Sequence, residues 1–345
     1  MSRFIKHILF LVSAIICYGA CKPPVKESDP LPALLNQGIY IVNEGNFMSG
    51  NGSVSFYDSA TNKVTQDLFF LKNNKPAGDV CQSLSFYNNQ FYLVVNNSSK
   101  IELLNEEFIN TKTITGLTSP RYITFASNQK GYITDLYAKG VSVFNTVSGV
   151  IEKKIDIPYW TEEILHYSDT LYVTSPSSRY LYLIDSKTDN LKDSIDIGFG
   201  SSSITQDENK LLWILCDGKE SNSILPSIIC INPVNRQIVR TIKAADYSSF
   251  ASKIHFNPID KNIYWIDGGG ISTLNTTATG ASKTLAIDSK GRNFYGLTIN
   301  PVTGDILVSD AGDFSQRSTI YIYSKNHVEK NVFQAGLISG YILVR

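Results

Sequence analysis

The sequence predicts an all-β domain, because one pattern of strands and turns recurs about every 40 residues from near Gly38 to the C-terminus. One copy of the pattern runs from Arg121 to Ile157, and the next runs from Glu162 to Ile197. Each copy holds four short runs of β-branched and aromatic residues, separated by turn residues. A repeat of this length with four strands predicts the blade of a β-propeller.

The strands of each blade can be placed in order from a central channel outward, using period-two alternation. Inner strands are predicted at Leu84–Phe86, Tyr122–Phe125, Ile164–His166, Ser203–Thr205, Lys253–Phe256 and Gly296–Ile299. Second strands follow at Phe91–Asn96, Gly131–Asp135, Thr170–Ser175, Leu211–Asp217, Asn262–Asp267 and Asp305–Asp310. Third strands follow at Lys100–Asn105, Val141–Thr146, Tyr180–Asp185, Ser227–Asn232, Gly270–Asn275 and Thr319–Ser324.

The two ends of the repeat region complete a seventh blade. Gly38–Gly45 reads as a second strand with no inner strand before it, and Ser53–Asp58 and Val64–Phe70 follow as third and outer strands. Ser339–Arg345 reads as an inner strand with nothing after it. Pairing the last strand with the first leaves no free sheet edge. We therefore predict a seven-bladed β-propeller over residues 38–345, closed by strands from both ends of the chain.

The segment before the propeller has the pattern of a secreted lipoprotein. Arg3 and Lys6 precede an apolar stretch that is too short to span a bilayer, so residues 1–20 are predicted to be a signal peptide. Small residues precede Cys21 as in a bacterial lipobox, and we expect lipidation of Cys21; ordinary signal-peptidase cleavage is the alternative. The proline-rich residues 21–37 are predicted to be an extended tether.

Charge and cysteine content exclude two classes of protein. The 345 residues carry 31 Lys+Arg and 31 Asp+Glu, so no nucleic-acid partner is expected. Cys81, Cys216 and Cys230 are an odd set at irregular spacing, which does not form a disulfide framework. Cys216 and Cys230 fall on strands predicted to be adjacent, so a bridge between them is an alternative, but buried free thiols are favoured.

No arrangement of residues in the sequence predicts catalysis. His166 and His255 fall on inner strands and His327 falls in a turn, so no histidine is placed to orient a nucleophile. Acidic residues recur at the ends of second strands: Glu44, Asp135, Asp217, Asp267 and Asp310. A ring of carboxylates could bind a cation, but we favour hydrogen bonding of each aspartate to its own loop. We predict a protein that is not an enzyme and has no cofactor or metal site.

Ligand-binding residues are expected on one face of the propeller, where the loops between second and third strands and the crossings between blades meet. Aromatic and arginine side chains in these segments are the candidates: Phe47, Tyr137, Tyr159, Trp160, Arg179, Phe199, Tyr247, Arg292, Phe294 and Tyr295. Arg121 and Arg317 are further candidate partners for phosphate or amide groups. For each aromatic the alternative is packing between neighbouring blades.

The blade pattern, with third strands such as Phe56-Tyr57-Asp58 and turns such as YDSATNKV and FNTVSGV, resembles the surface-layer/YncE-like seven-bladed propellers. The opening segment GIYIVNEGNFMSGNGSVSFYD is similar to lipid-anchored propellers of Gram-negative gut bacteria that capture cobalamin beside an outer-membrane transporter. The resemblance implies a cell-surface protein anchored to the outer membrane. It also implies capture of cobalamin or a related corrinoid as a ligand, and its transfer to a TonB-dependent transporter.

Two other functions stay open at this stage. A glycan-binding or protein-interaction module would use the same loops, since propeller faces suit extended contacts. A metal-assisted lactonase or lyase would need carboxylates and amides such as Glu44, Asn96, Asp135 and Asp267 to converge on one cation. Ligand identity would discriminate among these functions.

Overall fold

The computed structural model describes residues 37–247, 252–278, 280 and 282–345. These residues belong to one compact unit, Pro32–Arg345. The predicted signal peptide, the lipidation site at Cys21 and nearly all of the predicted tether lie outside the described residues. None of the described helices is both long and apolar enough to cross a membrane.

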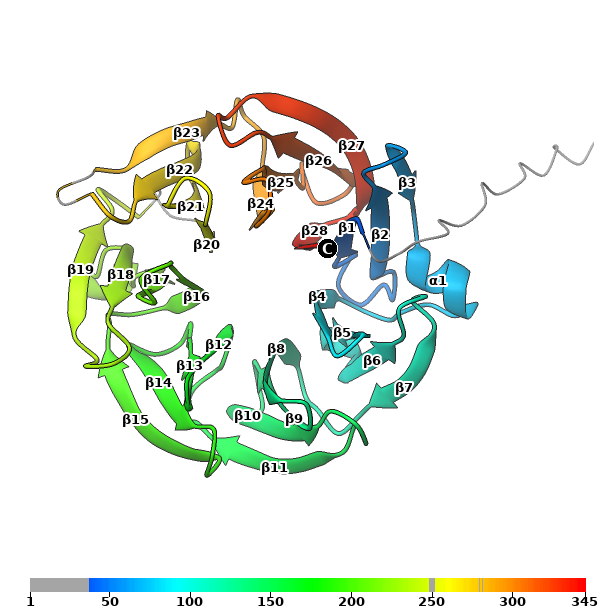
Figure 1. The fold of residues 1–345 in the computed structure, drawn as a ribbon, viewed down its shortest axis with the longest axis horizontal. Coiled ribbons are helices and arrows are strands. Elements are labelled where there is room, and N and C mark those ends of the chain that lie inside the picture. Colours follow the sequence, from blue (N-terminus) through cyan, green and yellow to red (C-terminus); the bar gives the residue numbers. More distant parts are fainter. Residues whose placement is uncertain (1–36, 248–251, 279, 281) are drawn as a thin grey trace, which may run out of the picture. The chain divides into compact units, whose positions relative to one another are not determined.

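The described residues form seven four-stranded antiparallel sheets, arranged as the blades of a propeller (Figure 1). From the channel outward, the first two blades are β28 (Ser339–Val344), β1 (Ile39–Asn43), β2 (Ser53–Asp58) and β3 (Lys63–Thr65), and then β4 (Cys81–Tyr87), β5 (Gln90–Val95), β6 (Lys100–Leu104) and β7 (Asn110–Ile114). The third and fourth blades are β8 (Pro120–Ser127), β9 (Lys130–Asp135), β10 (Gly140–Asn145) and β11 (Ile151–Asp156), and then β12 (Ile164–Tyr167), β13 (Thr170–Val173), β14 (Tyr180–Asp185) and β15 (Asn190–Asp196). The last three blades are β16 (Ser201–Gln206), β17 (Leu212–Cys216), β18 (Ser227–Ile231) and β19 (Ile238–Lys243); β20 (Ser252–Asn257), β21 (Asn262–Asp267), β22 (Gly270–Asn275) and β23 (Thr284–Asp288); and β24 (Phe294–Ile299), β25 (Ile306–Asp310), β26 (Arg317–Tyr323) and β27 (Glu329–Leu337). The remaining elements are α1 (Leu68–Asn73), η1 (Asn96–Ser98) and η2 (Glu220–Asn222). The predicted all-β propeller is confirmed.

The hydrophobic core is divided into seven clusters, and each cluster lies between two neighbouring blades. Alternation along β5 shows how this arises: Phe91 and Leu93 pack toward one neighbouring blade, while Tyr92 and Val94 pack toward the other. Both faces of the second strands are therefore buried, which explains their nearly continuous apolar sequence. Cys81, Cys216 and Cys230 are buried free thiols within these clusters, so the favoured prediction is confirmed.

One predicted strand is wrong in its second half. Val64–Phe70 is not a single outer strand, because β3 ends at Thr65 and Asp67 adopts a left-handed conformation with φ of 50°. Residues from Leu68 onward form α1, which buries Leu68 and Phe69 against the first two blades. Phe69 and Phe70 both favour strands, so the local sequence did not indicate that this segment packs as a helix.

Strands from both ends of the chain close the ring. β28 pairs with β1 in antiparallel register from Ile39–Val344 to Asn43–Ser339. Asn43 is fully buried and links four strands: its Nδ2 donates to Ser53 and Ser55, and its Oδ1 accepts from the Gly336 amide and the Ser339 hydroxyl. The seam therefore depends on a side chain whose full hydrogen-bonding capacity is used.

Asn43→Ala should lower the free energy of unfolding by about 3 kcal/mol, because it leaves several buried donors and acceptors without partners. Thermal and chemical unfolding of the variant would measure this loss. Asn222→Ala, at an exposed position in η2, is the matched control and should change stability by less than about 0.5 kcal/mol. Equal stability of the two variants would show that the Asn43 contacts do not hold the seam.

Candidate functional site

The inner strands begin with irregularities that place consecutive side chains near the channel. Single-residue bulges occur at Gln82 in β4, Ser202 in β16 and Lys253 in β20, each opposite a regular second strand. β8, β24 and β28 also shift register near their first residues. A bulge redirects a side chain that would otherwise alternate between the faces of the sheet. Lys253 has a φ of 58°, an uncommon conformation for a residue with a side chain.

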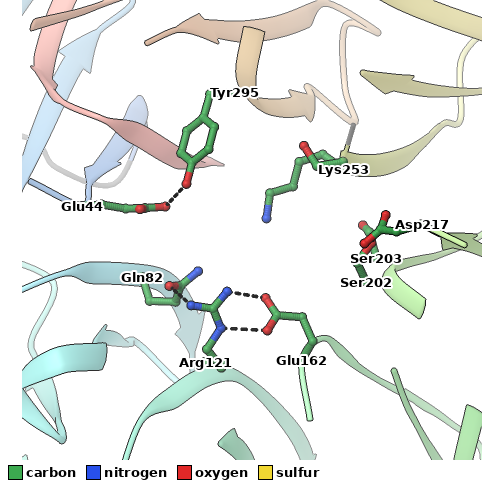
Figure 2. Close-up of a pocket in the computed structure, with 10 residues that line it drawn as sticks. Glu44, Gln82, Arg121, Glu162, Ser202, Ser203, Asp217, Lys253 and Tyr295 are labelled. Carbon is green, nitrogen blue, oxygen red and sulfur yellow. Dashed lines mark hydrogen bonds and ion pairs between the residues drawn. The ribbon is translucent and has the colours of Figure 1, made fainter. Parts of the chain in front are cut away.

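These strand ends surround a hollow of about 200 Å³ at the mouth of the channel (Figure 2). Every blade contributes to its lining, which consists of Glu44, Gln82, Arg121, Glu162, Ser202, Ser203, Asp217, Ser252, Lys253 and Tyr295. The lining holds three carboxylates, two cations and otherwise amide and hydroxyl groups. We call this cavity the hollow, and the surrounding face of second-to-third loops and blade crossings the loop face.

Arg121 is held in place by two neighbouring blades. Its Nε donates to Glu162 Oε2 at 2.8 Å and its Nη2 donates to Glu162 Oε1 at 2.5 Å, which is a bidentate pair. Its Nη1 donates to Gln82 Oε1. The Arg121 side chain is 20% exposed and that of Glu162 is 9% exposed, so the pair is largely removed from solvent. The guanidinium is therefore fixed in orientation, and most of its donors are already used.

Lys253 is the second cation of the hollow and makes fewer contacts. Its Nζ donates to the Tyr122 hydroxyl at 2.8 Å, and the Glu163 carboxylate lies 3.9 Å away. Glu163 in turn accepts hydrogen bonds from the Ser203 hydroxyl and the Ile204 amide, each at 2.9 Å. Burial opposes the charged form of Lys253, but its Tyr122 and Glu163 neighbours outweigh burial and raise its pKa. Lys253 is thus a firmly protonated ammonium.

Glu44 reaches the hollow from the loop after β1. Its Oε1 accepts a hydrogen bond from the Tyr295 hydroxyl at 3.0 Å, and burial raises the pKa of its carboxyl. The inner strand of the same blade has glycine at the adjacent position, and a Cβ on Gly340 would lie only 2.3 Å from Glu44 Oε1. The small residue at position 340 therefore provides the space that the Glu44 carboxylate occupies.

The repeated acidic residues separate into two groups. Asp135 accepts hydrogen bonds from four backbone amides, at Thr118, Ser119, Tyr137 and Ala138. Asp267 and Asp310 likewise accept from backbone amides of nearby loops, so the favoured structural interpretation holds for these three residues.

Asp217 and Glu44 face the hollow instead. Asp217 accepts from the Ser202 hydroxyl at 3.2 Å, and loss of hydration beside the hollow raises its pKa to about 6. Within the part of the chain that the structure describes, no group of three or more His, Cys, Asp or Glu side chains is placed to hold a metal ion.

Several predicted ligand-binding residues lie exposed on the loop face. Tyr137 is 58% exposed and Trp160 is 41% exposed, and their rings meet edge to face with centroids 5.6 Å apart. Phe47 and Tyr159 are also exposed, in the loop after β1 and the crossing before β12. The exposed aromatic side chains of the described residues all lie in or beside loop-face segments or α1: Phe47, Phe70, Tyr137, Tyr159, Trp160, Tyr180 and Phe314.

The other predicted ligand-binding residues divide between the hollow and structural positions. Tyr295 lines the hollow. Phe294, the residue before it, is only 7% exposed and packs in the cluster between the last two blades of the sequence, so it is a packing residue. Arg292 stacks on Tyr321 with its guanidinium carbon 4.0 Å from the ring centroid, and donates to the Tyr323 hydroxyl.

Two more predicted residues are engaged by single charged partners. Arg179 pairs with Asp196 at 2.7 Å on the surface, and Phe199 lies beneath the Lys219 ammonium, 4.4 Å from its ring centroid. Tyr247 is partly exposed in the turn after β19 and is absent from the lining of the hollow.

Sequence reasoning missed most of the hollow. Gln82, Glu162, Glu163 and Lys253 were not among the candidates, although Gln82 and Lys253 are the second residues of their inner strands and Glu162 and Glu163 directly precede β12. The available signal was the alignment of blades: charged side chains recur where three inner strands begin, at Arg121 in β8, at Glu162 and Glu163 directly before β12, and at Lys253 in β20. Reading each blade separately concealed this column of charges.

Comparison with solved structures shows the fold alone. A quinonprotein alcohol dehydrogenase-like protein from Bacteroides thetaiotaomicron superposes with a TM-score of 0.71 at 14% identity, over 90% of this chain and 79% of that one. The periplasmic gluconolactonase PpgL of Pseudomonas aeruginosa superposes with a TM-score of 0.65 at 10% identity, over 89% and 99%. Hydrazine synthase of Kuenenia stuttgartiensis superposes with a TM-score of 0.61 at 14% identity, over 71% and 77%.

The sequence itself has a family match. No functionally curated protein matches it. The profile of a domain of unknown function, DUF5074, matches residues 37–339, from the start of the described propeller to the first residue of its last strand. The chain therefore belongs to the DUF5074 family.

Proposed function

We propose that this protein is a lipid-anchored binding protein at the cell surface, which captures cobalamin or a related corrinoid and passes it to a TonB-dependent transporter of the outer membrane. One observation carries the proposal: exposed aromatic side chains and a charged hollow occur together on the loop face. A corrinoid is a wide ligand with an apolar ring and a rim of amide groups. Such a ligand needs aromatic contacts for the ring and hydrogen-bonding partners for the rim.

The polar groups of the hollow support binding of a ligand with both donors and acceptors. Carboxylates of Glu44 and Asp217 supply acceptors, Lys253 supplies a donor, and Gln82 supplies both. The exposed pair of Tyr137 and Trp160 supplies an apolar surface at the edge of the same face. Lipidation of Cys21 and the extended tether, both predicted from the sequence, would hold the propeller at the membrane that carries the transporter.

The first test is calorimetric titration of the full chain, in mild detergent, with cyanocobalamin and dicyanocobinamide. We expect one-to-one binding of both, because the corrin ring and its amides are common to the two ligands. Trp160→Ala should weaken binding about tenfold or more, since buried aromatic contacts dominate interface energetics. The control is Val234→Ala, which removes an exposed apolar side chain from the β18–β19 turn on the opposite face.

Absence of binding by either corrinoid would overturn the proposed ligand. The glycan- or protein-interaction alternative would then lead, because stacked aromatics and polar loops also suit those partners. The gluconolactonase among the similar solved structures suggests a catalytic alternative, the hydrolysis of a lactone. Hydrolysis of glucono-δ-lactone by the full chain, above the uncatalysed rate, would overturn the view that the protein binds without changing bonds.

Binding should also depend on pH, because the carboxyl groups of Asp217 and Glu44 in the hollow have raised pKa values. Desolvation raises the pKa of Asp217 to about 6, with a smaller contribution from Glu162, and burial raises the pKa of Glu44. Lowering the pH from about 7.5 to about 5 protonates Asp217 and removes an acceptor, so affinity for a donor-rich ligand should fall. Titrations across this range should show a weaker pH dependence for Asp217→Asn than for the unmodified protein.

The raised pKa of Asp217 also predicts how the stability of the folded protein changes with pH. Because the folded-state pKa of Asp217 lies above its ordinary value, the folded protein holds more protons than the unfolded chain between about pH 4 and 6. The folded state is therefore penalised above pH 6, and the penalty disappears below about pH 4. Asp217→Asn should raise the melting temperature at pH 7.5 and leave it nearly unchanged at pH 4; a lower melting temperature at pH 7.5 would contradict the shift.

A further inference from the structure

Within the described residues, three side chains of the hollow keep unused hydrogen-bonding capacity. An ammonium has three donors, and Lys253 uses one on the Tyr122 hydroxyl while Glu163 stays 3.9 Å away. Glu44 accepts from Tyr295 at one oxygen, and Asp217 accepts from Ser202 at one oxygen. Among the described residues, neither of these carboxylates has a cation within 4.0 Å. Arg121, in contrast, is committed to Glu162 and Gln82.

The unused groups come from three different blades and point toward one space. Figure 2 shows Lys253 extending into the hollow, with Glu44 and Asp217 on its two sides. A fixed donor between two acceptors complements a group that has one acceptor and two donors. The primary carboxamide is such a group, because its oxygen accepts and its nitrogen donates twice.

Singly charged groups fit this arrangement less well. A carboxylate in the hollow would pair with Lys253 but would also face the charges of Glu44 and Asp217. An alkylammonium would pair with these carboxylates but would face Lys253. Like charges close together in a partly desolvated site are unfavourable, so a neutral group with both donors and an acceptor has the advantage.

The size of the hollow limits how much of a ligand can enter. Its volume is about 200 Å³, below the roughly 300 to 1,000 Å³ of pockets that enclose whole drug-sized ligands. A side arm fits, whereas the ring of a large ligand has to remain outside, against the loop face. The exposed aromatic side chains lie on that face.

We propose that the hollow is a specificity subsite for a primary carboxamide arm, with Lys253 donating to the carbonyl oxygen and Glu44 or Asp217 accepting from the nitrogen. This inference rests on the proposed function, since the amide arms of a corrinoid are the groups that would enter. The subsite selects corrinoids whose arms are amidated and excludes those whose arms are free carboxylates.

Gly340 is the positioning residue of this subsite. Its missing side chain leaves room for the Glu44 carboxylate, and a Cβ there would lie 2.3 Å from Glu44 Oε1. Because that oxygen ends a flexible side chain, Gly340→Ala should displace Glu44 without preventing folding. The variant should lose selectivity for amides and keep a melting temperature close to that of the unmodified protein.

The test compares dicyanocobinamide, which carries amide arms, with cobyrinic acid, in which the arms are carboxylates. Calorimetry on the full chain should show at least tenfold tighter binding of dicyanocobinamide. Lys253→Met should weaken its binding about tenfold, and Glu44→Gln combined with Asp217→Asn should reduce the preference between the two ligands. The control, Lys325→Met, removes an exposed cation from the β26–β27 turn on the opposite face and should change neither affinity.

Equal affinity for the two corrinoids, or a preference that the hollow variants leave unchanged, would overturn the subsite while the proposed function stands. If neither corrinoid binds, the proposed function fails and the hollow is tested alone by NMR titration with propionamide, propionate, propylammonium and alanine. Shifts of inner-strand amides with propionamide above the other three would support the subsite. No response to propionamide would overturn it, as would a stronger response to alanine, which would indicate a zwitterion site.

Discussion

The structure depends on a constraint that each blade meets in the same way: both faces of a four-stranded sheet must be covered by the next blade. The seven core clusters show this directly, since each takes side chains from two neighbouring blades and none lies within a single blade of the described chain. A ring satisfies the constraint only when it closes. The pairing of β28 with β1, and the buried Asn43 that links them to β2 and β27, therefore stabilises every blade indirectly.

Closure also creates the hollow, because it brings the first residues of all inner strands together around one axis. Inner strands of neighbouring blades contact one another, so their side chains are crowded where the strands begin. Charged groups in this position lose hydration, and such groups persist only when they are paired. Glu162 with Arg121, and Glu163 with Ser203 and the Ile204 amide, meet this requirement. Glu44, Asp217 and Lys253 meet it only in part.

The fold could be predicted from the sequence because its signals are local and repeated. Period-two alternation in runs such as Asn262–Asp267 identifies a strand without knowledge of its neighbours, and the unmatched strands at the two ends imply the closure. Asp135, Asp267 and Asp310 were interpreted correctly for the same reason, since each accepts from a backbone amide two residues further along the chain. Burial of Leu68 and Phe69 in α1 depends on the next blade, and this long-range contact left no local signal.

The hollow could not be predicted in the same way, because its residues are distant in sequence and meet only through ring closure. Glu44 and Tyr295 are 251 positions apart, and Lys253 and Tyr122 are 131 positions apart. Adjacent residues can have opposite roles at this point: Phe294 packs between blades while Tyr295 faces the channel. Composition of a loop therefore indicates the face on which a ligand binds but not which of its side chains reach the axis.

The division between an aromatic loop face and a charged hollow has a consequence for recognition. Apolar contact provides affinity but discriminates poorly between ligands of similar size, since a hydrophobic surface cannot strongly reject an added polar group. A desolvated polar site discriminates well, because a ligand that lacks the matching donor or acceptor leaves protein groups unpaired. On this protein the two properties are separated in space, with Tyr137 and Trp160 on the loop face and Lys253 between Glu44 and Asp217 in the channel. Affinity and specificity can then be changed independently, by substitutions of the exposed aromatic residues of the loop face or of the charged residues of the hollow.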